Sequence, residues 1–180
     1  MKKALYLLAT LSDRDFEWLL QVGRAKQISA GTVLIREGEP TDALYIVVEG
    51  NLAVLVEALD DEEIARLSTG EVVGEMSFVD SRRPSATVKA IEDSLVWAIP
   101  RSQLAAKLNQ DVAFASHFYQ AIAAFLSDRL RSTVSRLGYH KDPQLPELEE
   151  QDLNPQVSGN LELAKTRLDW LLNQLRSRHK

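Results

Sequence analysis

One loop of the sequence combines a glycine, an acid and two arginines in a pattern that could bind a small ligand. The loop runs from Val73 to Val88, and Gly74 is followed directly by Glu75. A glycine allows a tight turn or a close approach of the backbone to a ligand. A short helical turn after Glu75 would present backbone N–H groups, and such donors beside a carboxylate suit a ligand with a phosphate and a sugar hydroxyl. A Gly–Glu pair in a turn is also a common structural feature, so the loop alone leaves both interpretations open.

The loop lies in a segment, 25–100, that has the texture of an antiparallel β-protein. Short apolar runs alternate there with glycines, prolines and the pair Asp60-Asp61, at intervals of roughly 8–12 residues. This spacing is typical of a barrel, sandwich or roll, and nothing in it indicates a βαβ unit. The expected strands are Thr32–Ile35, Ala43–Val48, Asn51–Val56, Glu63–Leu67, Val72–Val73, Ala86–Ile91 and Leu95–Ile99.

Helical patterns precede and follow the β segment. Ser12 with Asp13 and Asp15 predicts a helix start, since acids favour the positive end of the helix dipole. The short apolar run at 4–11 follows two lysines, as in a signal peptide. No small-residue cleavage site follows it, so we expect a segment that packs its leucines inside the protein.

A short helix at 102–108 and a long one from Asp111 to about Leu137, ending at Gly138, follow the strands. The apolar stripe of the long helix is wider than one small β-domain needs. We therefore expect a second copy of the chain to pack there, giving a homodimer. The residues expected at this contact are Phe114, Phe118, Ile122, Phe125 and Leu130.

The remainder of the chain divides into two further parts after the domain at 1–138. Residues 139–157 hold three prolines and several acids, which predicts a solvated acidic linker. Residues 158–180 predict an amphipathic tail helix, because Leu161, Ala164, Leu168, Leu171 and Leu175 recur at steps of three and four. Folding back onto the domain and association with a partner both remain open for this helix.

Three runs of sequence carry a family resemblance: Arg36–Gly50, Gly70–Glu75 and Ser85–Val88. With the order of helix, strands, short helix and long helix, the stretch from about 11 to 137 resembles the cyclic nucleotide-binding domain. That domain is shared by Crp/Fnr-type regulators, protein kinase A regulatory subunits and gated channels. The resemblance implies a mainly β fold with α: an antiparallel, jelly-roll-like β-roll flanked by an N-terminal helix and a long C-terminal helix, here with a tail helix added.

The resemblance also implies a ligand pocket in the phosphate cassette of the roll. In nucleotide-binding members, the acid equivalent to Glu75 accepts a hydrogen bond from the ribose 2′-hydroxyl. An arginine just before the exit strand pairs with the cyclic phosphate, and that slot here holds Pro84, which has neither charge nor N–H. A charge-assisted bond of this kind contributes about 1.5–3 kcal/mol, or roughly 10–150-fold in affinity. The expected pocket residues are Gly74, Glu75, Met76, Arg82, Arg83, Pro84, Ser85, Ala86 and Thr87.

The two arginines before Pro84 could supply the missing cation only from particular positions. In an extended chain Arg83 points to the face opposite the slot, so only Arg82 or a rearranged turn would return a cation. Binding of cyclic AMP or cyclic GMP is thus one expectation, and a degenerate or differently used pocket is the favoured one.

Composition and spacing argue against several other classes of protein. Of the 180 residues, 45% are hydrophobic and 26% charged, as in ordinary globular proteins; the net charge is −5, and there is no cysteine. All three histidines follow the β segment, which excludes a cupin-type metal site among the strands, and no catalytic triad or phosphate-loop motif can be assembled. No helix-turn-helix pattern follows the long helix. We expect no enzyme activity, no bound metal, no direct nucleic-acid or membrane contact, and a cytoplasmic location.

Two functions remain from the sequence. The favoured one is a regulatory protein-interaction module, or an altered-ligand regulator, whose long helix and tail helix contact an unknown protein partner. The alternative is a true cyclic AMP or cyclic GMP sensor that acts through the same helices.

Overall fold

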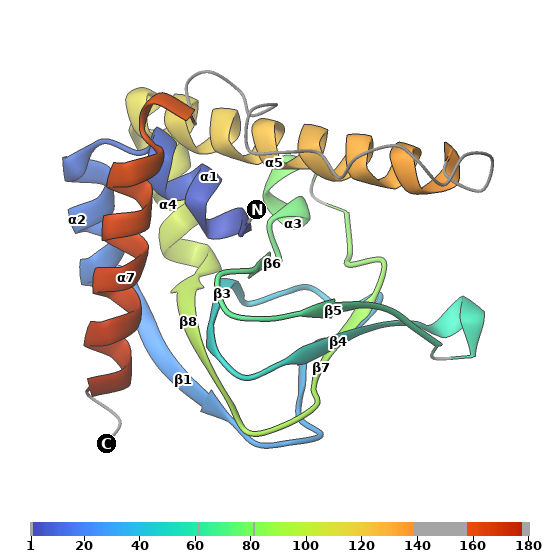
Figure 1. Cartoon of the computed structure of the whole chain (residues 1–180). Coiled ribbons are helices and arrows are strands. Elements are labelled where there is room, and N and C mark those ends of the chain that lie inside the picture. Colours follow the sequence, from blue (N-terminus) through green and yellow to red (C-terminus); the bar gives the residue numbers. More distant parts are fainter. Residues whose placement is uncertain (1, 61, 81, 139–157, 178–180) are drawn as a thin grey trace.

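The strands form two four-stranded antiparallel sheets that face each other as a roll, with helices packed on one side (Figure 1). The computed structural model describes residues 2–60, 62–80, 82–138 and 158–177; the linker expected at 139–157 lies outside the described residues. The first sheet has the order β1-β8-β3-β6 and the second the order β2-β7-β4-β5. The strands are β1 (Arg24–Ile28), β2 (Val33–Ile35), β3 (Ala43–Glu49), β4 (Leu52–Val56), β5 (Glu62–Leu67), β6 (Val72–Val73), β7 (Thr87–Ala90) and β8 (Ser94–Pro100).

Strand β3 is buried on both faces and separates two hydrophobic cores. Its even-numbered residues, such as Leu44 and Ile46, belong to a core shared with the helices. Its odd-numbered residues, such as Tyr45 and Val47, belong to a second core between the two sheets. Because successive side chains of a strand point to opposite faces, one continuous apolar run supplies both cores. The fold is therefore layered as helices, sheet and sheet.

The strands agree with the expected β-roll except for one addition. Strand β1 was not expected from the sequence; it pairs antiparallel with β8, with Arg24 opposite Ala98. It lies at the edge of its sheet, and its residues are mostly exposed, so it lacks the apolar alternation that identifies a half-buried strand. Gly23 precedes it, and a Cβ there would lie 2.2 Å from Trp97 Nε1, so the turn into β1 requires a glycine.

Two helices precede the roll, and the first explains the apolar run near the N-terminus. Helix α1 (Lys3–Thr10) buries six consecutive residues, from Ala4 to Ala9. It is covered by α5 (Val112–Gly138) on one side and by α7 (Leu161–Ser177) on another. A helix buried all round has no need of a polar face, which is why this run shows no helical period.

Helix α2 (Asp13–Val22) starts at the expected capping residues and is fixed to α5 by a partly buried pair, Asp15 and His117. The Oγ of Ser12 accepts the backbone N–H of Asp15 at 3.2 Å, and Asp15 Oδ2 accepts the N–H of Ser12 at 3.0 Å. The same oxygen lies 2.7 Å from His117 Nδ1. Burial alone raises the pKa of Asp15, but the hydrogen bonds with Ser12 and His117 outweigh it and hold that pKa below 3.8. His117 is thus a packing histidine that joins α5 to α2.

The long helix uses most of its apolar stripe inside the chain, which corrects the expected dimer contact. Phe114, Phe118, Ile122 and Phe125 are at most 2% exposed and pack in the helical core. The wide stripe has a simple cause: both α1 and α4 (Arg101–Gln110) pack against it. Of the five residues expected to meet a second copy, Leu130 alone is exposed.

The tail helix α7 folds back onto the domain and does not extend away from it. Its residues Ala164, Leu168, Leu171, Leu172 and Leu175 are buried in the same core as α1. Figure 1 shows α7 packed beside α1 and α2 and running toward β1. The a/d-like stripe seen in the sequence is therefore used within the chain.

A buried arginine fixes α7 at the C-terminal end of α1. Arg167 is 6% exposed, and its Nη1 donates to the carbonyls of Leu8 and Leu11, each at 2.7 Å. Its Nη2 contacts Asp13. Asn160 adds a hydrogen bond to the carbonyl of Ala9 at 3.0 Å. The last carbonyls of a helix have no partner within it, so α7 supplies donors that α1 itself lacks.

Replacing this arginine should loosen α7 before the roll. In Arg167→Met the carbonyls of Leu8 and Leu11 lose their donors, and we expect a cost of about 2–3 kcal/mol in the free energy of unfolding. Amide hydrogen exchange should accelerate along α7 and α1 and stay unchanged in the strands. Lys165→Met, on the exposed side of the same helix, is the matched control and should do neither. Equal exchange in the two variants would show that Arg167 does not hold the tail.

Candidate functional site

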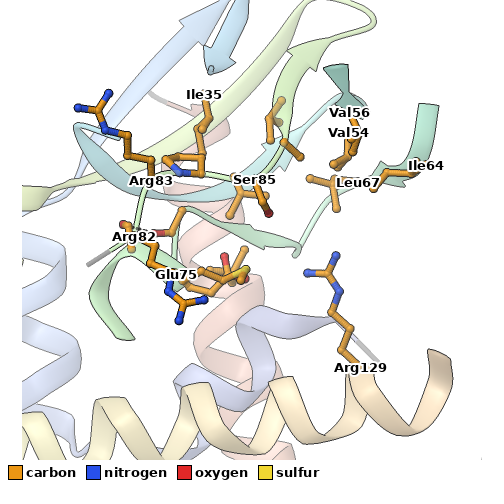
Figure 2. A pocket seen from close by; sticks show the side chains of 18 of the residues that line it. Ile35, Val54, Val56, Ile64, Leu67, Glu75, Arg82, Arg83, Ser85 and Arg129 are labelled. Carbon is orange, nitrogen blue, oxygen red and sulfur yellow. Dashed lines mark hydrogen bonds between the residues drawn. The ribbon is translucent and has the colours of Figure 1, made fainter. Parts of the chain in front are cut away.

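A cavity of about 350 Å³ opens between the second sheet, the loop after β6 and the side chains of α1 and α5. Its apolar wall comes from Ile35, Val54, Val56, Ile64 and Leu67, which Figure 2 labels around the space. Its polar lining comes from the segment 74–86 together with Lys3 and Arg129. A volume of this size lies in the range of small-molecule sites.

Gly74 shapes the bottom of the cavity because of its backbone. Its φ is +88°, and a Cβ at this position would lie 2.8 Å from the carbonyl oxygen of Ala43. A larger residue would be strained by both the dihedral angle and the close contact. The chain can therefore leave β6 and enter the short helix α3 (Met76–Val79) without moving away from β3.

Glu75 is a buried acid facing the cavity. It is 4% exposed and lines the space from its lower side in Figure 2. Burial raises its pKa above 4.5, and the charges of Lys3 and Arg129 partly oppose that rise. A buried carboxyl of this kind can accept hydrogen bonds from ligand hydroxyls, since water reaches it poorly.

Helix α3 is fixed to the rest of the protein by an arginine that sequence reasoning missed. Arg101 Nη1 donates to Ser77 Oγ at 2.7 Å, and its Nη2 donates to the carbonyl of Ser77 at 3.0 Å. Ser77 Oγ in turn donates to the carbonyl of Gly74 at 2.8 Å. The guanidinium also lies 4.9 Å from the ring centroid of Phe78. No local pattern marks Arg101 in the sequence, because its partners lie 24 residues away.

The exit from the loop is tied to the turn before β3. The N–H of Gly38 donates to the carbonyl of Pro84 at 2.9 Å, and Arg83 Nη1 donates to the carbonyl of Gly38 at 2.8 Å. Thr87 Oγ1 accepts the N–H of Glu37 at 3.0 Å. Arg83 therefore reaches over the outside of the loop, as Figure 2 shows, and Thr87 serves the structure without lining the cavity.

Most of the pocket residues expected from the sequence meet at this cavity. Eight of the nine line it: Gly74, Glu75, Met76, Arg82, Arg83, Pro84, Ser85 and Ala86. Pro84 stands in the slot expected for an arginine. Arg82 is mostly exposed, and its Nε lies 3.5 Å from Asp80 Oδ2. The sequence analysis did not identify Lys3 and Arg129 as lining residues, because they belong to α1 and α5 and lie far from the loop in the sequence.

The arrangement can recognise a small polar molecule. Glu75 is a hydroxyl acceptor, the walls are apolar, and several cations surround the opening. Among the described residues no group of three or more His, Cys, Asp or Glu could hold a metal ion. Within the same residues no helix is both long and apolar enough to cross a bilayer.

The roll with flanking helices and a glycine-acid cassette defines a class of domain. It is the architecture of cyclic nucleotide-binding domains. Residues 25–111 match the family model described as the cyclic nucleotide-binding domain, so this part of the chain is a member of that family. The resemblance expected from the sequence is confirmed at the level of family and fold.

Solved structures support the same fold. A cyclic nucleotide-binding domain from Methylobacillus flagellatus matches with a TM-score of 0.65 at 21% identity, covering 82% of this chain and 85% of that one. The catabolite activator protein of Thermus thermophilus matches with a TM-score of 0.59 at 22% identity, covering 94% and 87%. The regulatory domain of Toxoplasma gondii protein kinase A, crystallised with cAMP, matches with a TM-score of 0.52 at 29% identity, covering 56% and 39%.

Curated relatives are longer proteins that contain a similar segment. A protein of Rhodopseudomonas palustris whose name places it among potassium channels is 27% identical over 141 residues. That match spans 78% of this chain and 34% of the relative. An uncharacterized NTE family protein of Mycobacterium tuberculosis is 27% identical over 130 residues, which is 72% of this chain and 22% of the relative. The chain thus spans about a third or less of these relatives.

The buried acid should make stability fall with rising pH in a defined window. The pKa of Glu75 is raised above 4.5, so the unfolded chain releases this proton first as pH increases. Above pH 4.5 the wild type therefore loses stability relative to Glu75→Gln, by about 1.4 kcal/mol for each pH unit until the folded pKa is reached. Urea unfolding between pH 4 and 8 measures the difference, with the exposed Glu17→Gln as control. A difference that does not change with pH would contradict the burial of a titrating carboxyl.

Proposed function

We propose that this chain is a non-catalytic regulatory module whose roll cavity is an altered cyclic-nucleotide pocket. The proposal rests on two features that occur together in the cassette. Glu75 is buried at the cavity, and Pro84 occupies the position where an arginine is expected. The cavity keeps its volume and its hydroxyl acceptor, but the cassette offers no guanidinium to a cyclic phosphate. In this proposal a cyclic nucleotide binds weakly at best, and the module acts with another ligand or through a protein partner.

The position of Arg83 supports this proposal. Its guanidinium is held on the carbonyl of Gly38, outside the loop, and Arg82 lies beside Asp80 in solvent. Neither arginine takes the place that Pro84 leaves vacant. A phosphate bound at the cassette exit would therefore lack the charge-assisted hydrogen bonds that an arginine in this slot would donate.

A second function, true sensing of cyclic AMP or cyclic GMP, is favoured by one observation. Glu75 and the apolar walls around it are arranged as a pocket of sufficient size, open to ligand. The likeness to a kinase regulatory domain crystallised with cAMP points in the same direction. The two functions differ in whether the cassette binds a cyclic phosphate without its arginine.

The effect of binding either kind of ligand could be transmitted to the helices through the same contacts. Helix α3 touches α4 through Arg101, and its Phe78 packs edge-on against Phe118 of α5, with ring centroids 6.2 Å apart. Tyr119 Oη lies 3.4 Å from the carbonyl of Phe78. A ligand that favours one position of α3 over another would shift these contacts, because a switch requires different affinity for two arrangements. The cytoplasmic location and the absence of direct DNA binding belong to the same proposal.

Restoring the arginine tests the altered cassette. Pro84→Arg should raise the affinity for cyclic AMP by roughly 10–150-fold over wild type. Isothermal titration with cyclic AMP and cyclic GMP measures the gain, and Pro84→Ala is the matched control that restores the N–H without the charge. The double variant Pro84→Arg with Glu75→Gln should lose much of the gain. Micromolar binding by the wild type that Pro84→Arg does not improve would instead favour the sensor.

We also propose that two copies pair through the outer face of α5. Tyr119 and Leu130 are exposed at positions eleven residues apart on the same side of this helix, with Leu126 half-buried between them. Eleven residues are close to three helical turns, so these side chains form one stripe. The described elements leave Tyr119 and Leu130 exposed, although α3 reaches the hydroxyl of Tyr119 through the carbonyl of Phe78.

Charge on that stripe should separate the copies. We expect wild type to sediment as a dimer at tens of micromolar and Leu130→Glu to sediment as a monomer, because a buried unpaired carboxylate opposes association. Ala113→Glu adds the same charge to the polar flank of α5 and should leave the dimer intact. A monomeric wild type, or a dimer unaffected by Leu130→Glu, would count against this contact.

A further inference from the structure

The tail helix α7 is attached to the domain through backbone carbonyls at two separate places. Arg167 donates to the carbonyls of Leu8 and Leu11 at the C-terminal end of α1. One residue before the end of α7, Arg176 Nη2 donates to the carbonyl of Val48 in β3, at 3.0 Å. A carbonyl moves with its own backbone, so the docking of α7 depends on the positions of α1 and of β3.

The N-terminal end of α1 is fastened to the turn 68–71, which joins β5 to β6. The N–H of Ala4 donates to the carbonyl of Gly70 at 2.9 Å. Lys3 Nζ lies 2.8 Å from Glu71 Oε2, and both of these side chains are mostly buried. One end of α1 therefore contacts this turn, and the other end contacts Arg167 of α7.

The second attachment of α7 leads to the same turn. The pairing of β3 with β8 shifts register between Val47 and Glu49, which leaves Val48 at a bulge. The carbonyl of Val48 accepts Thr69 Oγ1 from the turn at 3.3 Å as well as the guanidinium of Arg176. A bulge takes a residue out of the strand ladder, so this carbonyl is shared between the turn and the tail.

The turn 68–71 also borders the roll cavity. Leu67 and Val72, on its two sides, line the cavity, and so does Lys3. Burial raises the pKa of Glu75, the charge of Lys3 lowers it, and the charge of Glu71 raises it. The pair of Lys3 and Glu71 therefore belongs electrically to the cavity and mechanically to α1.

Helix α1 connects the cavity to the tail as one short body. Its eight residues span about 12 Å, and every residue from Ala4 to Ala9 is buried. It lies beside α7 (Figure 1) and also packs on α5. A close-packed helix of this length moves as a unit, because protein interiors do not deform continuously. A displacement at Lys3 therefore reaches the carbonyls that hold Arg167.

A ligand in the cavity competes with Glu71 for the ammonium of Lys3, because this side chain lines the space. We propose that α7 is a releasable output of the module: a ligand bound in the cavity draws Lys3 from Glu71, shifts α1 and loosens the docking of α7. The inference deepens the proposed function, on which it rests, by naming what the cavity controls. Release of α7 opens its buried leucines and the face of α1 to a protein partner.

The test uses the full chain carrying Pro84→Arg, with cyclic AMP as the probe. Saturating nucleotide should accelerate amide hydrogen exchange along α7 by about fivefold or more, without accelerating it in the strands. Coupling is reciprocal, so adding Arg167→Met to this variant should tighten cyclic AMP binding in isothermal titration. Adding Lys165→Met, on the exposed side of α7, is the matched control and should leave the affinity unchanged.

A second measurement needs no ligand. Lys3→Met removes the ion pair with Glu71 and should accelerate exchange along α7 in the free protein. In the double variant Pro84→Arg with Lys3→Met, cyclic AMP should bind without further accelerating that exchange, because the connection to α1 is already cut. Lys89→Met, on the exposed face of β7, is the matched control and should change neither result.

The outcomes separate this inference from the altered-pocket proposal. If Pro84→Arg gains cyclic AMP affinity and the nucleotide leaves α7 exchange unchanged or slows it, the release of α7 is overturned and the altered pocket stands. If Pro84→Arg gains no affinity, the altered pocket is overturned, and the free protein decides on α7. Unchanged exchange in Lys3→Met then overturns the connection through α1, and faster exchange supports it. Circular dichroism checks that each variant folds.

Discussion

The structure depends on one sheet that must bury both of its faces. Strands β3 and β8 place alternate residues in the helical core and in the core of the roll. Neither half is complete alone, because exposing either face of β3 would leave an apolar surface open to water. Helices α1, α5 and α7 therefore form one cover for the sheet, and α1 lies between the other two. The roll cavity depends on both the roll and the helices, since its lining residues come from the roll, from α1 and from α5.

The cassette is the point where the two halves meet. Gly74 brings it within contact distance of β3, and the hydrogen bonds from Arg101 to Ser77 attach α3 to the start of α4. Phe78 then reaches the aromatic side chains of α5. A ligand that changes the position of α3 must therefore disturb contacts with two helices. A protein-interaction module and a ligand-responsive regulator could both use these contacts, because in either case the same helices change position.

Local patterns predicted the elements that depend on local chemistry. The capping residues at Ser12 and Asp15, the glycine-punctuated strands and the cassette turn all lie where the sequence placed them. Strand β1 was missed because an edge strand with exposed Lys26 and Gln27 carries little apolar period. The covering of α5 by α1 and α4 was also hidden, and so Phe118 and its neighbours were assigned to a dimer contact. Arg101 and Arg129 could not be found from the cassette sequence, because distant helices deliver them to it.

The central claim is that the cavity keeps a buried hydroxyl acceptor, Glu75, while the cassette lacks its phosphate contact because Pro84 stands in the slot expected for an arginine. A crystal structure of the Pro84→Arg variant with cyclic AMP tests this most directly. The account predicts a ribose hydroxyl on the Glu75 carboxyl and the cyclic phosphate on the guanidinium that the substitution introduces. A nucleotide bound away from Glu75, or an introduced guanidinium that does not reach the phosphate, would contradict it.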